Sequence, residues 1–369
     1  MPETRKSPEI EAGLIAKSVA VGAALGIESL RHLDQTLRRR GVREGLGSSR
    51  ACVASDTSVA RVCGQTKTAW VRKALRASWR RVRSRGLLGV KVADKKLRVG
   101  ILDGTTVGGQ MASVLVEVGE IPTPLCLGRI VKRGKELPMS LAVLQHVAKA
   151  EGRGVLTHTM GDGLYACESF WQTCEGVGTC GIVKTCEAGS LTILQDANQM
   201  FDAPTRLPGV EYVEGTDAER GCRYRIWAVA DLPWSHTDRL LKVARVEETG
   251  LKGPKAGESE RFWVISQDQT LDAWMLRTLG HRRWFIENNQ FKAFNEQAHS
   301  KHVFSRDPHT ALVISALQMI GTLWIMGYHH FLAQFRDQMK SLWDHGTFPM
   351  KGLRDLLWTS LPLVEADTT

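Results

Sequence analysis

The sequence predicts a mixed α/β protein with an amino-terminal helical region and an all-β insertion. Three observations predict this class. Apolar residues recur at helical spacing over residues 10–86, strand and helix patterns alternate over 96–187, and only strand patterns follow over 188–262. Helical patterns return from Thr270. We therefore divide the chain into a helical basic region (1–92), a first core part (93–187), the insertion (188–262), a second core part (263–335) and a tail (336–369).

Positive charge is concentrated in the first hundred of the 369 residues. They hold 22 Lys and Arg against 8 Asp and Glu, whereas the remainder holds 27 against 31, and the whole chain has a net charge of +10. Such asymmetry predicts a region that holds nucleic acid, joined to a near-neutral part. A solvated charged face is the alternative. We expect phosphate contacts from the basic residues of one helix: Arg72, Lys73, Arg76, Arg80, Arg81 and Arg83.

That helix is predicted from its apolar stripe. Val71, Leu75, Trp79 and Val82 are spaced by four, four and three residues, and Gly86 is a plausible stop. Since Trp79 lies on the stripe, we expect it in the core rather than stacked on bases.

The chain shows no sign of export or membrane insertion. Its start lacks a positive stretch followed by an apolar run, and its eight cysteines form no C-x-x-C pair. We expect reduced thiols, no structural zinc site and a cytoplasmic, nucleoid-associated protein. The uncharged segment 311–328 is nearly long enough to span a membrane, but Ser315, Gln318 and Thr322 interrupt it, which favours a buried core helix.

The first core part alternates strands and helices. LRVGILDGTT (97–106), MASVLVEVG (111–119) and LCLGRIVKRG (125–134) are typical of strands, and ELPMSLAVLQHVAKAEG (136–152) of a helix. GVLTHTMGDG (154–163) predicts a strand, ACESFWQTCEG (166–176) a helix and CGIVKTC (180–186) a strand. This order predicts a mixed sheet.

Two acids follow strands of this sheet. Asp103 and Asp162 each end a strand pattern and each precede a glycine, which lets a bound group approach the backbone closely. A single Asp-Gly pair usually marks a turn. Two such pairs at strand ends of one sheet favour a ligand site, because ligands gather at that edge in α/β folds.

A third acid lies on a predicted helix. If the helix starts after Gly280, Glu287 shares one face with Trp284, Phe291 and Phe294. A carboxylate within an aromatic stripe needs a metal or a cation. Its alternative partner is Arg283, four residues earlier. Together, Asp103, Asp162 and Glu287 would suit two Mg²⁺ or Mn²⁺ ions and phosphoryl transfer.

These motifs resemble the DDE transposases of bacterial insertion sequences. ILDGTT around Asp103, MGDGLYA around Asp162 and RRWFIENNQFK around Glu287 carry the resemblance, which is greatest to the IS4-like subgroup with a β-strand insertion. It implies a ribonuclease H-like core with Asp103, Asp162 and Glu287 as catalytic metal ligands. It also implies cleavage and strand transfer at the ends of an element, and a dimer when two DNA ends are synapsed.

The last motif departs from the family at two positions. Gly280 stands where the family has Tyr, and Phe294 stands where it has Lys, two side chains that contact phosphates in the family. We expect Arg283, which fits the pattern, and Lys292 to contact DNA, with Arg282 or His281 as substitutes. A decayed or co-opted copy that only binds DNA, and a ribonuclease H-like nuclease that only hydrolyses, are alternative functions.

Overall fold

A computed structural model describes most of the chain. The described residues are 10–47, 54–131, 134–186, 191–235, 237–251, 256–285 and 301–334, together with single residues 1, 5, 8, 294 and 299. Glu287, Lys292, the tail 336–369 and one cysteine, Cys52, lie outside them.

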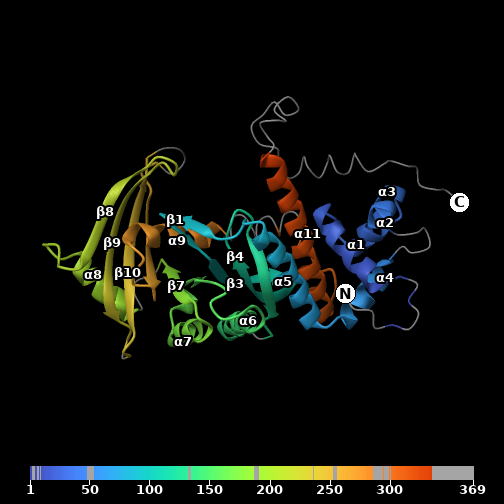
Figure 1. The fold of residues 1–369 in the computed structure, drawn as a ribbon, viewed down its shortest axis with the longest axis horizontal. Helices are drawn as coiled ribbons and strands as arrows, with labels where there is room; N and C mark the ends of the chain where they lie inside the picture. Colours follow the sequence, from blue (N-terminus) through green and yellow to red (C-terminus); the bar gives the residue numbers. More distant parts are fainter. Residues whose placement is uncertain are drawn as a thin grey trace, which may run out of the picture.

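One nine-stranded sheet organises the molecule (Figure 1). The strands, in spatial order, are β5 (Thr123–Arg129), β4 (Gln110–Glu117), β3 (Val99–Val107), β6 (His158–Gly161), β7 (Cys180–Thr185), β11 (Ser259–Ser266), β10 (Leu240–Gly250), β9 (Cys222–Pro233) and β8 (Val210–Asp217). β3, β4 and β5 are antiparallel, whereas β6 and β7 run parallel to β3. The first five strands thus have the order and directions of a ribonuclease H-like sheet, which confirms the predicted fold class.

The insertion continues this sheet instead of forming a separate one. β11 pairs with β7 antiparallel, from Trp263 opposite Thr185 to Ser266 opposite Ile182. The predicted boundary at residue 262 therefore falls within β11. A small hairpin of β1 (Val90–Val92) and β2 (Lys95–Leu97) likewise spans the boundary predicted at 92.

The expectation of strands alone in the insertion is wrong. Residues Thr192–Phe201 form helix α8, which buries Ile193, Leu194, Ala197 and Phe201. These four residues have helical spacing, and together they pack on the sheet with Val210 and Val243. A ten-residue helix between strand patterns carries a weak sequence signal, and tertiary packing stabilises it.

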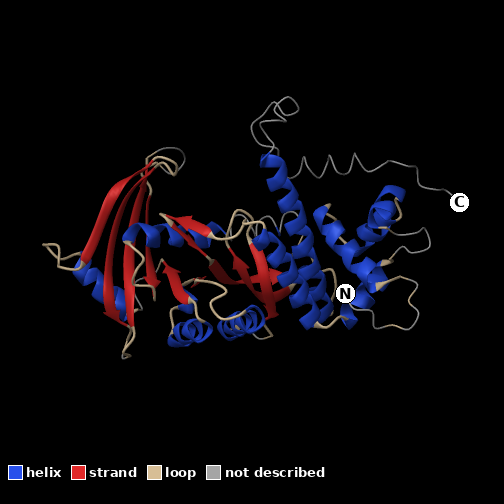
Figure 2. Ribbon diagram, in the orientation of Figure 1, coloured by secondary structure: helices blue, strands red, loops and turns tan. Residues whose placement is uncertain are grey.

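Helices cover both faces of the sheet (Figure 2). On one face α6 (Glu136–Glu151), η1 (Gly163–Tyr165), α7 (Glu168–Val177) and α8 share a core with Leu102 of β3. On the other face α9 (Ala273–Phe285) and α11 (Pro308–Gln334) pack with Ile101. Beyond α11 lie α1 (Ala12–Ala24), α2 (Leu30–Leu37), α3 (Arg40–Leu46) and α4 (Asp56–Gln65).

Helix α11 is the predicted core helix. Among the described residues, Pro308–Phe331 has the length and hydropathy of a membrane span, but 83% of its most apolar window is buried inside the protein. α1 lies against it so closely that a Cβ on Gly321 would approach the Ala20 carbonyl oxygen to 1.9 Å. The glycine therefore allows the two helices to cross.

Helix α5 (Thr68–Ser84) is fixed to the edge of the sheet. Val71, Leu75 and Trp79 are buried, as predicted. Trp79 Nε1 donates to Glu117 Oε2 at 2.7 Å, and Arg98 donates to both oxygens of this fully buried carboxylate at 3.1 Å. A buried charge needs such partners, so this contact holds the basic helix in one place.

Candidate functional site

The parallel register of β3 and β6 sets the relative positions of two predicted site acids, Asp103 and Asp162. The parallel pairs run from Val99 opposite His158 to Ile101 opposite Met160. The same offset, carried two positions further, puts Asp103 level with Asp162. Neighbouring strands lie about 4.8 Å apart, so the backbones that carry these acids are close at this edge of the sheet.

Glycines shape the loop that carries Asp162. Gly161 ends β6, and a Cβ there would lie 2.4 Å from the ring of Tyr165. Asp162 caps η1, since its Oδ1 accepts a hydrogen bond from the backbone N–H of Leu164 at 2.9 Å. The tight turn therefore fixes Asp162 at the end of the strand.

A further acid, Glu136, lies at the same edge. It begins α6, and its carboxylate rests on the backbone of Gly104, where a Cβ would lie 2.5 Å from Glu136 Oε2. Burial, and then the negative charge of Asp162, raise the pKa of Glu136 above 4.5, while hydrogen bonds from Tyr165 and Gly104 oppose the rise. The glycine after Asp103 thus makes room for a neighbouring carboxylate.

A buried chain of hydroxyl groups ends at these acids. Ser113 Oγ lies 2.6 Å from Ser140 Oγ, which lies 2.8 Å from the Tyr165 hydroxyl. That hydroxyl is 3.5 Å from Glu136 Oε1. Burial strongly raises the pKa of Tyr165, and the charges of Glu136, Asp103 and Asp162 add to the rise. Tyr165 therefore keeps its proton beside three acids.

Sequence reasoning missed Glu136 and Tyr165. The search for acids after strand patterns does not find them, because Glu136 begins a helix and Tyr165 lies in a single 3₁₀ turn. A usable signal was the spacing of Glu136 and Ser140, which puts two polar side chains on one face of the first turns of the helix.

The helix that leads to Glu287 begins earlier than predicted. α9 starts at Ala273 rather than after Gly280, and Gly280 lies within it. A Cβ at Gly280 would lie 2.8 Å from the Phe262 ring, so the family's Tyr would not fit here. Leu276 and Leu279 are fully buried against the sheet.

Residues on either side of Glu287 lie against strands that flank the acids. Burial, with the charge of Arg283 among the further causes, lowers the pKa of Lys184 on β7. Phe294 is 3% exposed and lines a small cavity with Val114, the residue paired with Asp103. Phe294 is therefore a packing residue and does not replace the family's Lys.

Arg277 anchors α9 to the insertion. Its side chain is 2% exposed and donates to Glu248 Oε1 at 2.6 Å and to Asp217 Oδ2 at 3.0 Å. His281, proposed as a substitute phosphate contact, bonds to the same Glu248 oxygen at 2.9 Å and is mostly buried. Its imidazole therefore takes part in the contact that anchors α9 to β10.

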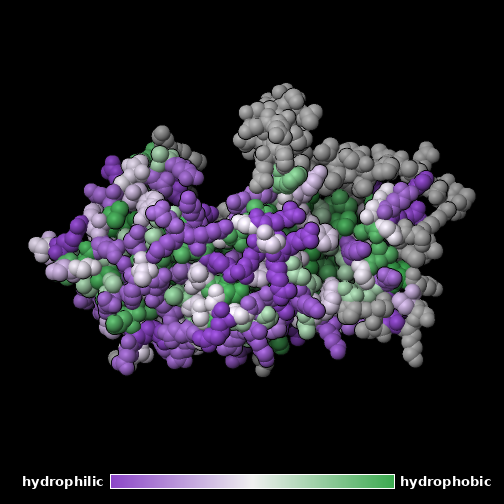
Figure 3. All heavy atoms as spheres, in the orientation of Figure 1, coloured by the Kyte–Doolittle hydropathy of each residue, from purple (hydrophilic) through white to green (hydrophobic). Residues whose placement is uncertain are grey.

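The predicted phosphate contacts divide into exposed and buried residues. Lys73, Arg80, Arg81 and Arg83 are exposed, although Arg80 also bonds to Glu151 at 2.7 Å. Hydrophilic residues cover the middle of the view in Figure 3, where Figure 1 places α5.

Two arginines of α5 differ from the expectation. Arg76 is 9% exposed, with its Nε 3.0 Å from Glu151 Oε1, and Arg72 Nε donates to the Leu127 backbone oxygen of edge strand β5 at 3.1 Å. Both turn inward because the apolar stripe they flank packs on the sheet. Arg76 is thus buried against Glu151, whereas Arg72 is half-buried and bonds to the sheet edge through its Nε.

Asp103, Asp162 and Glu136 do not form a group of described side chains whose ligand atoms all lie within 4.8 Å of one another. Asp103, Asp162 and Glu136 offer hard carboxylate oxygens, the type that Mg²⁺ and Mn²⁺ prefer. The charge of Asp162 raises the pKa of Glu136, and the charges of Glu136, Asp103 and Asp162 raise that of Tyr165. A bound cation would offset this repulsion.

No protein-family model and no curated protein matches the chain. One solved structure to which it is similar is described as "Cryo-EM structure of piggyBac transposase synaptic complex with hairpin DNA (SNHP)". The likeness has a TM-score of 0.45 and 10% identity, and covers 98% of this chain and 74% of that one. At this level the likeness assigns neither family nor activity.

The raised pKa of Glu136 predicts a pH-dependent cost to stability. An acid whose folded pKa exceeds its unfolded value binds its proton more tightly when folded, so stability falls as pH rises from about 4.5 through the folded pKa. Glu136→Gln removes this fall. In urea unfolding with EDTA, we expect the variant's stability relative to the native protein to increase with pH across this window. If the difference in unfolding free energy between variant and native protein does not change with pH, the raised pKa of Glu136 is contradicted. The same holds if it changes only as it does for the exposed Glu219→Gln.

Proposed function

We propose that the protein is a DNA transposase that cleaves phosphodiesters and transfers strands with divalent metal ions at an insertion-sequence end. The observation that carries the proposal is the parallel register of β3 and β6, which, extended two residues, puts Asp103 of β3 level with Asp162 directly after β6, while the Glu136 carboxylate lies against Gly104. The exposed basic face of α5 supplies the matching surface for a polyanion.

Each of these residues would have a distinct role in the reaction. Asp103 and Asp162 would hold the metal ions, which activate the attacking oxygen and stabilise the leaving oxygen. The Tyr165 hydroxyl, which stays protonated, would donate a hydrogen bond to Glu136 and so orient its carboxylate.

We propose Glu287 as the third acid of the reaction, as the family pattern implies. Its support is indirect, since it lies outside the described residues. The charge of Arg283 contributes to the lowered pKa of Lys184 on β7. Phe294 lines a cavity with Val114, which pairs with Asp103. Glu136 is the rival for this role.

We propose that Lys73, Arg81 and Arg83 hold DNA phosphates, with Arg283 and Lys292 contributing near the reacting end. Arg83 lies 5.3 Å from the centre of the Trp79 ring, so its guanidinium rests on a buried aromatic side chain. This support reduces the freedom that the side chain loses on binding. We also propose that the protein forms a dimer when two DNA ends are synapsed.

A protein that binds DNA without strand transfer is the second candidate. The observation that favours it is that the family's two phosphate-contacting positions are occupied by packing residues, Gly280 and Phe294. The presence of Asp103 and Asp162 in register favours the enzyme. A nuclease that stops after hydrolysis would share the acids, and would cleave without joining.

Substitution of the acids tests the reaction. On duplexes carrying the ends of the element that encodes this chain, we expect Asp103→Asn and Asp162→Asn to lower Mg²⁺-dependent cleavage at least about a thousandfold. The metal's charge stabilisation is worth several kcal/mol, and each 1.4 kcal/mol is tenfold. DNA binding should change little, because the basic face is untouched.

The third acid is assigned in the same assay. Glu287→Gln should abolish cleavage, whereas Glu136→Gln should retain a measurable rate; the reverse result would give the role to Glu136. Full activity of Asp103→Asn would refute the enzyme. Cleavage without strand joining in the native protein would support the hydrolytic alternative.

The basic face predicts a salt dependence. Each phosphate contact contributes about 0.9 to the slope of log affinity against log salt. Changing Lys73, Arg81 and Arg83 to Ala should therefore lower the slope by about 2.7, measured by fluorescence anisotropy with a duplex. Changing Arg206, Arg223 and Arg225 of the insertion, which are also exposed, should leave the slope unchanged. Equal losses from both sets would show that α5 has no special role.

A further inference from the structure

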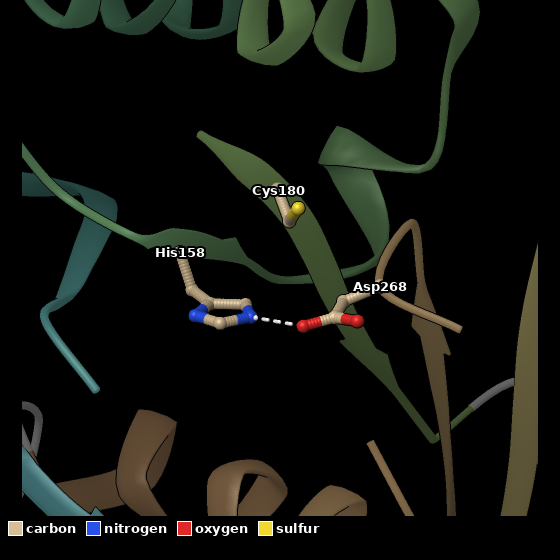
Figure 4. Close-up of side chains that lie close together, drawn as sticks. All are labelled: His158, Cys180 and Asp268. Carbon is tan, nitrogen blue, oxygen red and sulfur yellow. Dashed lines mark hydrogen bonds and ion pairs between the residues drawn. The ribbon is translucent and has the colours of Figure 1, made fainter. Parts of the chain in front are cut away.

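Three side chains of metal-ligand type converge at the edge of the sheet opposite the acids. His158 begins β6, Cys180 begins β7, and Asp268 follows β11. Figure 4 shows the imidazole of His158 directed at the Asp268 carboxylate, with the Cys180 sulfur beside them. One ligand atom from each lies within 4.8 Å of the other two.

The backbone dictates this convergence. His158 and Cys180 are directly paired in the parallel register of β6 and β7, so their side chains share a face of the sheet. The side chain of Gln267 accepts from the Gly181 N–H at 2.6 Å and donates to the Trp171 backbone oxygen at 3.2 Å. These bonds bring the neighbouring Asp268 to the start of β7.

The hydrogen bonds of His158 suit a ligand imidazole. Thr157 Oγ1 lies 2.9 Å from His158 Nδ1 and 3.1 Å from the backbone oxygen of Arg98. Without a metal, Nε2–H donates to Asp268 Oδ2. In the other tautomer the Nδ1–H donates to the Thr157 hydroxyl, which itself donates to the Arg98 oxygen, and the Nε2 lone pair is then available to a metal. Metal-binding histidines commonly donate their second ring N–H in this way, which fixes the ring and its tautomer.

Distances and donor types fit zinc. His158 Nε2 and Asp268 Oδ2 are 3.0 Å apart, close to the roughly 3.3 Å that joins two such ligands around tetrahedral Zn²⁺ with bonds near 2.0 Å. Asp268 is held in place, because its Oδ1 accepts two hydrogen bonds from Thr270. A thiol sulfur and an imidazole favour zinc over Mg²⁺ or Mn²⁺.

We propose that His158, Cys180 and Asp268 form a zinc site with water in the fourth position. Binding releases the Cys180 thiol proton to solvent and replaces the His158–Asp268 contact with two metal bonds. The site joins the starts of β6 and β7 to the loop after β11, which leads into α9. It lies about 13 Å along β6 from Asp162, so it is separate from the proposed catalytic acids.

A cysteine nucleophile does not explain the cluster. Both ring nitrogens of His158 already face other partners, Thr157 and Asp268. Burial, and then the charges of Asp268 and Glu175, raise the pKa of Cys180. The sulfur therefore lacks the paired base that an activated thiol needs.

Metal binding to the tag-free full chain tests the site. We expect one Zn²⁺ per chain after dialysis, and, with Co²⁺ as probe, a thiolate charge-transfer band with tetrahedral visible bands. Cys180→Ser should remove the charge-transfer band and weaken Zn²⁺ binding more than about a hundredfold, beyond the cost of losing an outer partner. Thr157→Val, which removes only the outer partner, should weaken it about tenfold.

Controls separate binding from folding. Cys186→Ser, which removes an exposed thiol outside the cluster, should bind Zn²⁺ with the affinity of the native protein. Circular dichroism with EDTA should show the same fold for every variant compared. No stoichiometric zinc in the native chain would overturn the site and leave a simple His158–Asp268 hydrogen bond. Equal loss in Cys186→Ser would overturn it as well.

Discussion

The parallel register of β3 against β6 decides which side chains meet at the carboxyl edge of the sheet. A shift of one residue would turn Asp103 or Asp162 to the opposite face, because strand side chains alternate. The register is fixed by burial, since Val99, Ile101 and Met160 are all fully buried. Apolar packing thus brings together charges that repel one another.

This repulsion explains several local features. Gly104 leaves space for Glu136, Gly161 leaves space for Tyr165, and a buried hydroxyl chain supports the tyrosine. These features hold Glu136 in a partly buried place, where burial and the charge of Asp162 raise its pKa. The basic helix α5 is attached at Glu117, which pairs with Gly100 near the start of β3.

Much of the fold could be predicted because its signals are local. The strand before Asp162, the stripe of α5 and the apolar helix α11 all follow from periodicity. The prediction that a strand ends at Asp103 is wrong, because β3 continues through Asp103 to Val107 and Asp103 pairs with Val114 within it. Other features depend on contacts between distant segments. Glu136 joins the acids through tertiary packing, and the continuation of the sheet through β11 depends on a pairing of residues about 80 apart. Arg76 turns inward because Glu151 lies there, which no spacing within α5 could show.

Uptake of Mn²⁺ at the strand-end acids tests the central claim most directly. Calorimetric titration would use a Cys180→Ser background, so that the thiol cluster does not contribute. We expect this protein to bind Mn²⁺, and the further change of Asp103 and Asp162 to Asn to weaken binding at least about a hundredfold, because ligand charge sets cation affinity. Equal Mn²⁺ binding with and without the two carboxylates would contradict a metal centre between the middle of β3 and the end of β6.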